Sequence, residues 1–427
     1  MILQNRTVEE INKKIENNNC NIFTAEEFKE LIAEGDAPTF DEVDVITTGT
    51  CGVMSGTAAV FNIIAADQGT FMRAKNIYLN DVPGSVGPCP NEWLGSVDLI
   101  LNGTSKSIYD SSYGGGFLFK DILQGKDIDV RVEAIDGEII ESSTNIDEMP
   151  TAQLFGTRMA FKNYTAFTNP SSSPVSSIFS AIPLDGPFSG LTFSGCGQLN
   201  PLQNDVKQNV IGFGTKILLN GAEGLVIGNG TRSSAEKPNL MLTGNLKEMD
   251  SGYIGGFKTG EGGEVYDTVA VPIPVLNEEI YNNILVQNKD IPLTVADIKG
   301  RIPITEMTYD DAWGDYDLRP RLNRTKCDKC SECSVEEICP TNALYDGRID
   351  LSLCFGCGLC AHYCKNNAIK MNTGAVDLEI DGVNHNIPIV CRQSDQLRAN
   401  KLSLKLKKMI ENNEFLLWMF KKSQTTL

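Results

Sequence analysis

Cysteines are concentrated in one short stretch near the end of the chain. Eight of the thirteen fall between Cys327 and Cys364. They form two runs, which read Cys327-x2-Cys330-x2-Cys333-x5-Cys339-Pro340 and Cys354-x2-Cys357-x2-Cys360-x3-Cys364. Paired runs of this kind are typical of the ligands of two [4Fe–4S] clusters in a bacterial-type ferredoxin. The sequence therefore predicts two such clusters.

The spacing of the cysteines predicts which of them share a cluster. Three cysteines two residues apart let one tight loop place three thiolates on three irons of a cube. The fourth cysteine of each run follows a helix and reaches the other cube, as in two-cluster ferredoxins. This crossing assigns Cys327, Cys330, Cys333 and Cys364 to one cluster, and Cys339, Cys354, Cys357 and Cys360 to the other.

Zinc and disulfides are weaker interpretations of the same cysteines. Zinc sites usually combine two pairs of ligands, and structural disulfides require an oxidising compartment. The first run departs from the usual pattern because five residues, not three, separate Cys333 from Cys339. The second run ends in Cys364-Lys365 where a proline is usual. Neither departure removes a ligand.

Length and charge limit the classes of function. A chain of 427 residues is too long for a ferredoxin alone and predicts two or three domains. The net charge of −18 argues against nucleic acid as a partner, because binding to phosphates needs a basic surface. No run of about eighteen apolar residues and no signal-peptide core are present, so we expect a cytoplasmic protein without a membrane partner.

The predicted fold class is α+β. Two capping boxes, Thr7-x2-Glu10 and Thr24-x2-Glu27, predict two short helices at the start. From about residue 40 to 310, short apolar runs separated by Gly, Pro, Asn and Asp predict many strands. Residues 54–67 and 294–301 are the clearest helix candidates in this region. The glycines of Gly114-Gly115-Gly116-Phe117 are interpreted as a turn.

Three domains are expected. Residues 1–320 would form a strand-rich catalytic domain, residues 321–380 a two-cluster ferredoxin unit, and residues 381–427 a C-terminal strand and helix. Residues 386–390 have the pattern of a strand and residues 393–412 that of an amphipathic helix, which we expect to pack on the large domain. Cys391, at the end of that strand, is interpreted as structural.

Three cysteines of the large domain lie among small residues: Cys51 in TTGTCGVMSGT, Cys89 in GSVGPCPNEW and Cys196 in FSGCGQLNP. Such settings favour an accessible sulfur with backbone amides that stabilise a thiolate. Cys51 also precedes the predicted helix 54–67, whose dipole would lower the pKa of its thiol. The three cysteines could form a persulfide relay or hold a third cluster with one open iron.

The same segments carry a family resemblance. GTCGVMSGT, VGPCPNEWLGSVDLIL, LFGTRMAFKNYTAF, FSGCGQLNPLQND and GNGTRSSAEKPNLML, followed by the ferredoxin unit, resemble the archaeal homocysteine-biosynthesis family. Its members include L-aspartate semialdehyde sulfurtransferase, and its ferredoxin-fused version is known as methanogenesis marker protein sixteen. The resemblance implies reductive incorporation of sulfide into L-aspartate 4-semialdehyde to give L-homocysteine, with sulfide or a persulfide as sulfur donor and a ferredoxin-like electron donor.

Such a substrate needs a cation for its carboxylate. Arg158 and Arg232, the latter with Ser233 and Ser234, are the best candidates, with Lys162 and Lys237 behind them. The only histidines, His362 and His385, lie in or after the ferredoxin unit, so Asp81, Glu92, Tyr164 or water would supply protons in the large domain.

Two other functions stay open. The chain could be an electron-transfer or cluster-carrier protein whose large domain binds a partner, or a sulfurtransferase acting on another carbonyl compound. A homo-oligomer is also possible.

Overall fold

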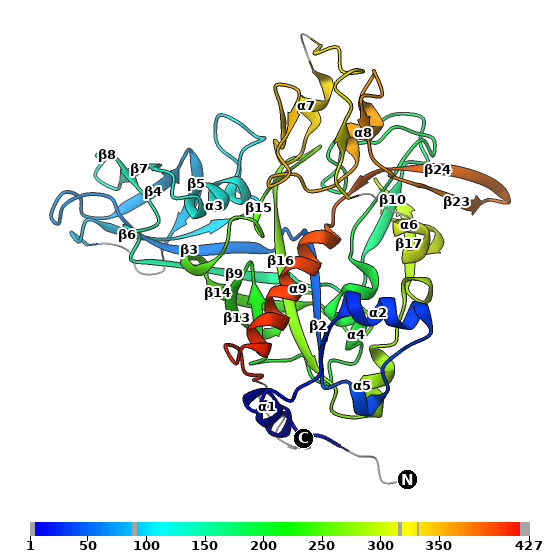
Figure 1. Ribbon diagram of the computed structural model, residues 1–427. Helices are drawn as coiled ribbons and strands as arrows, with labels where there is room; N and C mark the ends of the chain where they lie inside the picture. Colours follow the sequence, from blue (N-terminus) through cyan, green and yellow to red (C-terminus); the bar gives the residue numbers. More distant parts are fainter. Residues whose placement is uncertain (1–4, 88–91, 315–317, 331–332, 419–427) are drawn as a thin grey trace.

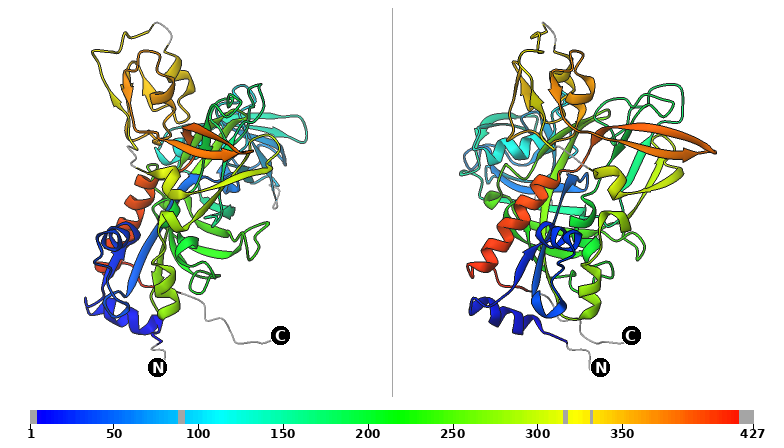
Figure 2. Two further views of the ribbon diagram at one scale, coloured as in Figure 1. Left: turned by 90° about the vertical axis from the view of Figure 1, so that its right-hand side faces the viewer. Right: turned by 45° about the vertical axis from the view of Figure 1, so that its right-hand side comes forward.

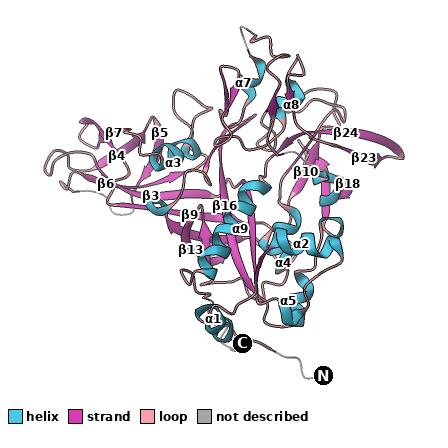
Figure 3. Cartoon of the chain, in the orientation of Figure 1, coloured by secondary structure: helices cyan, strands magenta, loops and turns pink. Residues whose placement is uncertain are grey.

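The computed structural model describes residues 5–87, 92–314, 318–330 and 333–418 (Figure 1). It is a mixed α and β fold in which strands dominate (Figure 3), as the spacing of apolar runs and turn residues predicts.

Within these residues the largest sheet has 14 strands. Its order is β1 (Ile22–Thr24), β2 (Val45–Val53), β16 (Gly262–Pro274), β12 (Lys216–Leu219), β13 (Ala222–Asn229), β14 (Leu240–Asn245), β9 (Thr151–Met159), β3 (Thr57–Ile64), β6 (Ser96–Asn102), β5 (Val82–Val86), β4 (Ala74–Leu79), β7 (Ile128–Ala134) and β8 (Ile139–Thr144). β15 (Gly255–Thr259) pairs with β16.

A second sheet has the order β18 (Pro303–Thr308), β17 (Pro292–Asp297), β10 (Thr165–Thr168), β11 (Leu191–Phe193), β24 (Val383–Arg392) and β23 (Ala375–Ile380). β24 pairs in parallel with β11 and antiparallel with β23. The C-terminal part of the chain therefore completes a sheet begun more than 190 residues earlier in the sequence.

The longer helices are α1 (Val8–Glu16), α2 (Ala25–Glu34), α3 (Gly115–Leu123) and α9 (Gln396–Glu411). Both predicted capping boxes are present, at Thr7 with Glu10 and at Thr24 with Glu27. α9 crosses β2 and β16, as Figure 1 shows. It packs so closely that a Cβ on Gly49 would lie 2.5 Å from the carbonyl oxygen of Ala399.

Shorter helices lie in the connections. These are α4 (Pro201–Asn204), α5 (Glu278–Asn283), α6 (Tyr309–Trp313), α7 (Ser334–Ile338) and α8 (Leu359–Tyr363), with 3-10 turns η1 (Phe40–Glu42), η2 (Gly197–Leu199), η3 (Leu246–Glu248) and η4 (Asn288–Asp290).

Three local predictions were wrong. Residues 54–67 contain β3 and not a helix, because Val60 and Phe61 pair with both β6 and β9 in the middle of the sheet, and Ile63 pairs with β6. Residues 294–301 begin in β17, which pairs with β10 and β18. In both segments the β-branched and aromatic residues pack better in a sheet than in a helix. The predicted turn at Gly114–Phe117 instead begins α3.

The cysteine-rich unit, residues 321–370, is built from short elements. It contains α7, α8 and two small ladders, β19 (Arg321–Leu322) with β22 (Ile369–Lys370) and β20 (Leu344–Tyr345) with β21 (Arg348–Ile349). This unit projects from the sheets in all views (Figure 2). Its two ends meet in the β19–β22 ladder, where Leu322 lies opposite Ile369.

No helix in the described part of the chain is long and apolar enough to cross a membrane.

Candidate functional site

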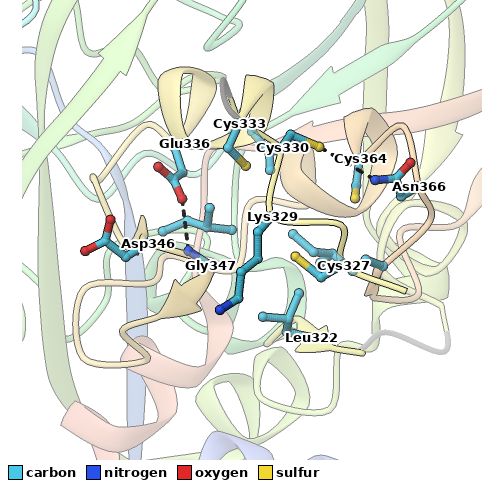
Figure 4. A pocket seen from close by; sticks show the side chains of 14 residues that line it. Leu322, Cys327, Lys329, Cys330, Cys333, Glu336, Asp346, Gly347, Cys364 and Asn366 are labelled. Carbon is cyan, nitrogen blue, oxygen red and sulfur yellow. Dashed lines mark hydrogen bonds between the residues drawn. The ribbon is translucent and has the colours of Figure 1, made fainter. Parts of the chain in front are cut away.

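Four cysteines of the unit surround one cavity. Cys327, Cys330, Cys333 and Cys364 line a space of about 400 Å³, together with Lys329, Glu336 and Asp346 (Figure 4). The side chain of Asn366 donates through Nδ2 to the Cys330 sulfur at 3.6 Å. We call these four cysteines the outer site, and they are the same four that the crossing pattern assigns to one cluster.

The other four cysteines, Cys339, Cys354, Cys357 and Cys360, line a second, narrower cavity that we call the inner site. It is more buried, since Cys354 and Cys357 are each 7% exposed whereas Cys330 is exposed. Gly356 has φ +72°, and a Cβ there would lie 2.1 Å from the Leu318 carbonyl oxygen. Only glycine therefore allows this loop to pass so close to residue 318.

The residues present fit iron–sulfur clusters better than single metal ions. Among the described residues, no three His, Cys, Asp or Glu side chains lie close enough to hold one ion. A tetrahedral zinc site needs sulfurs about 3.8 Å apart, whereas the thiolates of a four-iron cube bind separate irons and lie farther apart. The Ala343 amide donates to the Cys339 sulfur at 3.2 Å, a contact typical of cluster thiolates.

Cys51 and Cys196 lie next to each other in the structure. Cys51 lies on β2, opposite Thr268 of β16, and Cys196 lies in the turn between β11 and η2. The Cys196 sulfur is 3.4 Å from the Cys51 nitrogen and 3.5 Å from its carbonyl oxygen. We call these two residues the cysteine pair. Cys89 lies outside the described residues.

The burial of the cysteine pair contradicts the predicted exposure of its sulfurs and the predicted lowering of the Cys51 pKa. Both thiols are fully buried, so the expectation of an accessible sulfur was wrong. The strand β3, and not a helix, follows Cys51, so the dipole expected from a helix at residues 54–67 is absent. Burial raises the pKa of the Cys51 thiol well above its usual range, and the nearby Asp395 raises it further. Burial also raises the pKa of Cys196 to about 12, although the Cys51 amide and the Thr50 hydroxyl oppose this shift.

Aromatic residues hold the turn that carries Cys196. Trp313 donates through Nε1 to the Gly195 carbonyl oxygen at 3.1 Å, and the Tyr309 hydroxyl donates to the Ser194 carbonyl oxygen at 2.9 Å. Gly195 has φ +103°, and a Cβ there would lie 2.0 Å from the Tyr309 hydroxyl and 2.8 Å from the Tyr164 ring. The position of Trp313 in the sequence carries no signal of this contact.

Residues 392–398, which we call the connector, touch both the inner site and the cysteine pair. The Arg392 amide donates to the Cys357 carbonyl oxygen at 2.8 Å, and Arg398 Nη1 donates to that of Cys354 at 2.8 Å. The Asp395 backbone amide donates to the Cys51 carbonyl oxygen at 3.0 Å, and the Gln396 side chain donates through Nε2 to the Cys196 carbonyl oxygen at 3.2 Å.

A buried ion network stiffens the connector. Asp395, fully buried, accepts from both Arg398 and Arg319, the latter at 2.9 Å. Arg398 also donates to the carbonyl oxygens of Gly252 and Ser352, and its guanidinium carbon lies 5.3 Å from the centre of the Tyr266 ring. Sequence reasoning missed these residues. The only signal was Asp395 as the N-cap of α9, which does not reveal burial.

Two of the predicted substrate-binding residues lie together in the structure. Arg158 and Arg232 lie near each other, and burial together with the charge of Arg232 lowers the pKa of Arg158. Among the described residues neither arginine forms an ion pair, and the buried Arg158 Nε has no partner. Arg158 stacks on Phe161 at 4.7 Å, and Phe161 contacts Tyr164 at 5.5 Å between ring centres.

The other residues predicted to bind substrate or transfer protons make different contacts. The Ser233 and Ser234 hydroxyls accept from the Asn239 and Lys237 amides, each at 3.1 Å, so they organise their own turn. The Lys162 amide donates to the Pro238 carbonyl oxygen. Glu92 is exposed and pairs with Arg73 at 2.7 Å. Asp81 lies in the turn between β4 and β5.

Tyr164 is the proton-donor candidate that lies beside the cysteine pair. Burial raises the pKa of its hydroxyl, and Cys196 adds to that shift. Its hydroxyl therefore stays protonated at neutral pH and can donate.

Comparisons with known proteins identify the family of the chain. A family model described as "Homocysteine biosynthesis enzyme, sulfur-incorporation" matches residues 20–417. An uncharacterized protein of Methanothermobacter thermautotrophicus is 50% identical over 413 residues, which are 96% of this chain and 94% of the relative. An L-aspartate semialdehyde sulfurtransferase of Methanosarcina acetivorans is 34% identical over 304 residues, 68% of this chain and 58% of the relative.

A shorter similarity and one negative result complete the comparison. Pyruvate synthase subunit PorD of Methanothermobacter marburgensis is 39% identical over 55 residues, which are 13% of this chain and 65% of the subunit. No solved structure matches the chain.

Proposed function

The chain belongs to the homocysteine-biosynthesis, sulfur-incorporation family, and on that basis we propose that it incorporates sulfide reductively into L-aspartate 4-semialdehyde to form L-homocysteine. The observation that carries this proposal is the cysteine pair, which the connector ties to the inner site through Cys51, Cys196, Cys354 and Cys357.

The chemistry needs a sulfur nucleophile and two electrons. Hydrosulfide adds to the aldehyde carbon, and loss of water gives a thioaldehyde. Two electrons and two protons then convert the thioaldehyde to the thiol of homocysteine. If the sulfur arrives as a persulfide, its release as sulfide takes two further electrons and two protons. Bound at the outer and inner sites, two [4Fe–4S] clusters would supply electrons one at a time.

The chain's own residues divide the remaining work. We assign to Cys51 the role of sulfur carrier, with Cys196 beside it as exchange partner. We assign to Tyr164, which lies next to Cys196, the role of proton donor. The guanidinium groups of Arg158 and Arg232, which form no ion pair among the described residues, suit the substrate carboxylate. Cys89 remains a candidate for the relay or for a third cluster with the pair.

The direct test uses the full chain, purified without oxygen and loaded with iron and sulfide. We expect homocysteine, measured by mass spectrometry, only when aspartate 4-semialdehyde, sulfide and a reduced low-potential electron carrier are all present. A replacement of both Arg158 and Arg232 by methionine should raise the KM for the aldehyde while leaving the cluster spectrum intact. Homocysteine formed equally well without any reductant would contradict the proposal.

The rival function is electron transfer or cluster delivery to a partner protein. It predicts that the chain transfers electrons or iron but forms no homocysteine under any of these conditions. The buried position of Cys51 and Cys196 favours the sulfurtransferase, because a surface for protein docking gains nothing from two fully buried thiols.

A further inference from the structure

Arg392 is a buried cation with unused hydrogen-bond donors. Its side chain lies at the end of β24, and the residue is 1% exposed. Nη2 donates to the Thr373 carbonyl oxygen at 2.8 Å, but Nε and Nη1 have no partner among the described residues. Leaving charged donors unsatisfied in a protein interior is strongly unfavourable. Such a side chain indicates that a further acceptor belongs beside it.

The position of Arg392 limits what that acceptor is. The backbone amide of Arg392 donates to the carbonyl oxygen of Cys357, an inner-site residue. Its Nη1 lies 3.8 Å from the position that a Cβ on Gly358 would take. The guanidinium carbon is 5.4 Å from the Trp313 ring and 6.0 Å from that of Phe193, so aromatic faces cover other sides. No carboxylate pairs with Arg392 in the described part of the chain. The unused donors therefore lie beside the inner site.

The outer site has a different electrostatic setting. The charged residues that line its cavity are Lys329, Glu336 and Asp346, and Lys329 and Asp346 are exposed to solvent. Solvent screens these charges, whereas a cation in the interior is screened far less. The buried guanidinium groups of Arg392 and Arg398 lie beside the inner site, and of these two only Arg398 pairs with a carboxylate in the described part of the chain. No buried cation is among the residues that line the outer cavity.

We propose that Arg392 is the counter-charge of an iron–sulfur cluster at the inner site and raises the reduction potential of that cluster. Reduction adds one negative charge to a cluster, so a buried cation that donates hydrogen bonds stabilises the reduced form more than the oxidised form. The inference deepens the proposed function, and rests on it only in requiring a cluster at the inner site.

The test is an EPR-monitored potentiometric titration of the full, anaerobically loaded chain. Arg392→Met removes both charge and donors, and Arg392→Gln removes the charge but keeps a donor. Lys329→Met is the matched control at the outer site. The inner signal is assigned with Cys360→Ser, which alters one inner-site ligand. These measurements need no turnover of substrate.

In Arg392→Met the inner cluster should show about a tenfold lower ratio of reduced to oxidised form at the wild-type midpoint, which is about 59 mV for one electron. Arg392→Gln should show a smaller shift in the same direction, and it decides the question if the methionine variant fails to fold. Lys329→Met should leave the inner midpoint unchanged. An unchanged inner midpoint in the folded Arg392 variant, or an equal shift of both clusters, overturns the inference.

The outcome is separate from that of the sulfurtransferase proposal. A wild-type chain that forms no homocysteine, while Arg392→Met lowers the inner midpoint, overturns the proposed function alone. A chain that forms homocysteine, while the variants leave the inner midpoint unchanged, overturns only the role of Arg392.

Discussion

The thiols of Cys51 and Cys196 keep their protons at neutral pH in this structure, because burial raises the pKa of each. A protonated thiol is a poor nucleophile. Sulfur transfer from the pair therefore requires a change from this structure, such as opening of the site or persulfide formation on Cys51. The arrangement protects the pair from adventitious oxidation in the meantime.

The role of Cys51 is tested by its removal. In Cys51→Ala, homocysteine formation should fall to background, because the variant lacks the sulfur that would carry the transferred atom. The iron content and visible spectrum should be those of wild type, since the outer and inner sites share no ligand with Cys51. Cys20→Ala is the matched control and should keep full activity, because Cys20 is a half-buried cysteine just before β1, which pairs with the opposite end of β2 from Cys51. Wild-type turnover in Cys51→Ala would remove Cys51 from the chemistry.

The raised pKa of Cys196 predicts a pH dependence. Alkylation by iodoacetamide, followed at this residue by peptide mass spectrometry, should be very slow at pH 7 and rise about tenfold per pH unit toward pH 12. The same peptide in the unfolded chain should level off above about pH 9. A native rate that already levels off near pH 8 would mean that the thiol is not held in its protonated form.

At the scale of elements, the start of α9 has two functions. Asp395 caps the helix by accepting from the Arg398 amide at 3.2 Å, and its carboxylate also pairs with the Arg319 and Arg398 guanidinium groups. The same turn contacts the backbone of both members of the cysteine pair. The stability of α9 on the sheet and the geometry of the site are therefore coupled.

Removing the Asp395 carboxylate should be costly. In Asp395→Ala two arginines, one of them buried, lose their counter-charge, and a buried pair broken in this way costs about 3–5 kcal/mol. The free energy of unfolding, measured by denaturant titration without oxygen, should fall by that order. Glu411→Ala is the control in the same helix, because Glu411 is half exposed and lies 3.9 Å from Lys407. Its loss should cost less than about 1 kcal/mol. Equal effects of the two changes would refute a structural role for the network.

At the scale of the whole molecule, local patterns in the sequence predict the elements well and their partners poorly. Capping boxes and the apolar pattern of residues 393–412 predict α1, α2 and α9, because those signals lie within the element itself. The grouping of the eight cysteines follows from their spacing. The helix predicted at 54–67 was wrong because β6 and β9, distant in sequence, pair with β3.

The candidate site depends even more on distant contacts. Cys51, Cys196 and Asp395 meet only when three widely separated segments fold together, and no local pattern carries that information. Small residues around Cys51 and Cys196 predict close packing, which is correct. They do not distinguish a loop at the surface from a strand in the core, and this is why the predicted exposure was wrong.

The chain continues into β24 and α9 after the cysteine-rich unit, so the unit can be removed by internal deletion but not by truncation. Truncation before Lys326 would also remove β24, which lies between β11 and β23, and α9, which covers β2 and β16. Such a truncated chain should not fold. Leu322 and Ile369 face each other in the β19–β22 ladder, so replacing residues 323–368 by Asn-Gly closes a tight hairpin without breaking either sheet.

We expect this excised chain to fold, with a circular dichroism spectrum dominated by strands, and to bind no iron after anaerobic loading, because all eight ferredoxin-type cysteines are gone. Cys51, Cys89 and Cys196 are retained, so the variant isolates the large domain's own metal-binding capacity. A folded variant that binds three or four irons per chain would show that these cysteines hold a further cluster and would exclude the simple persulfide relay. The matched control is the excised chain with Cys51→Ala, which should lose any such iron, since iron that persists there is bound elsewhere.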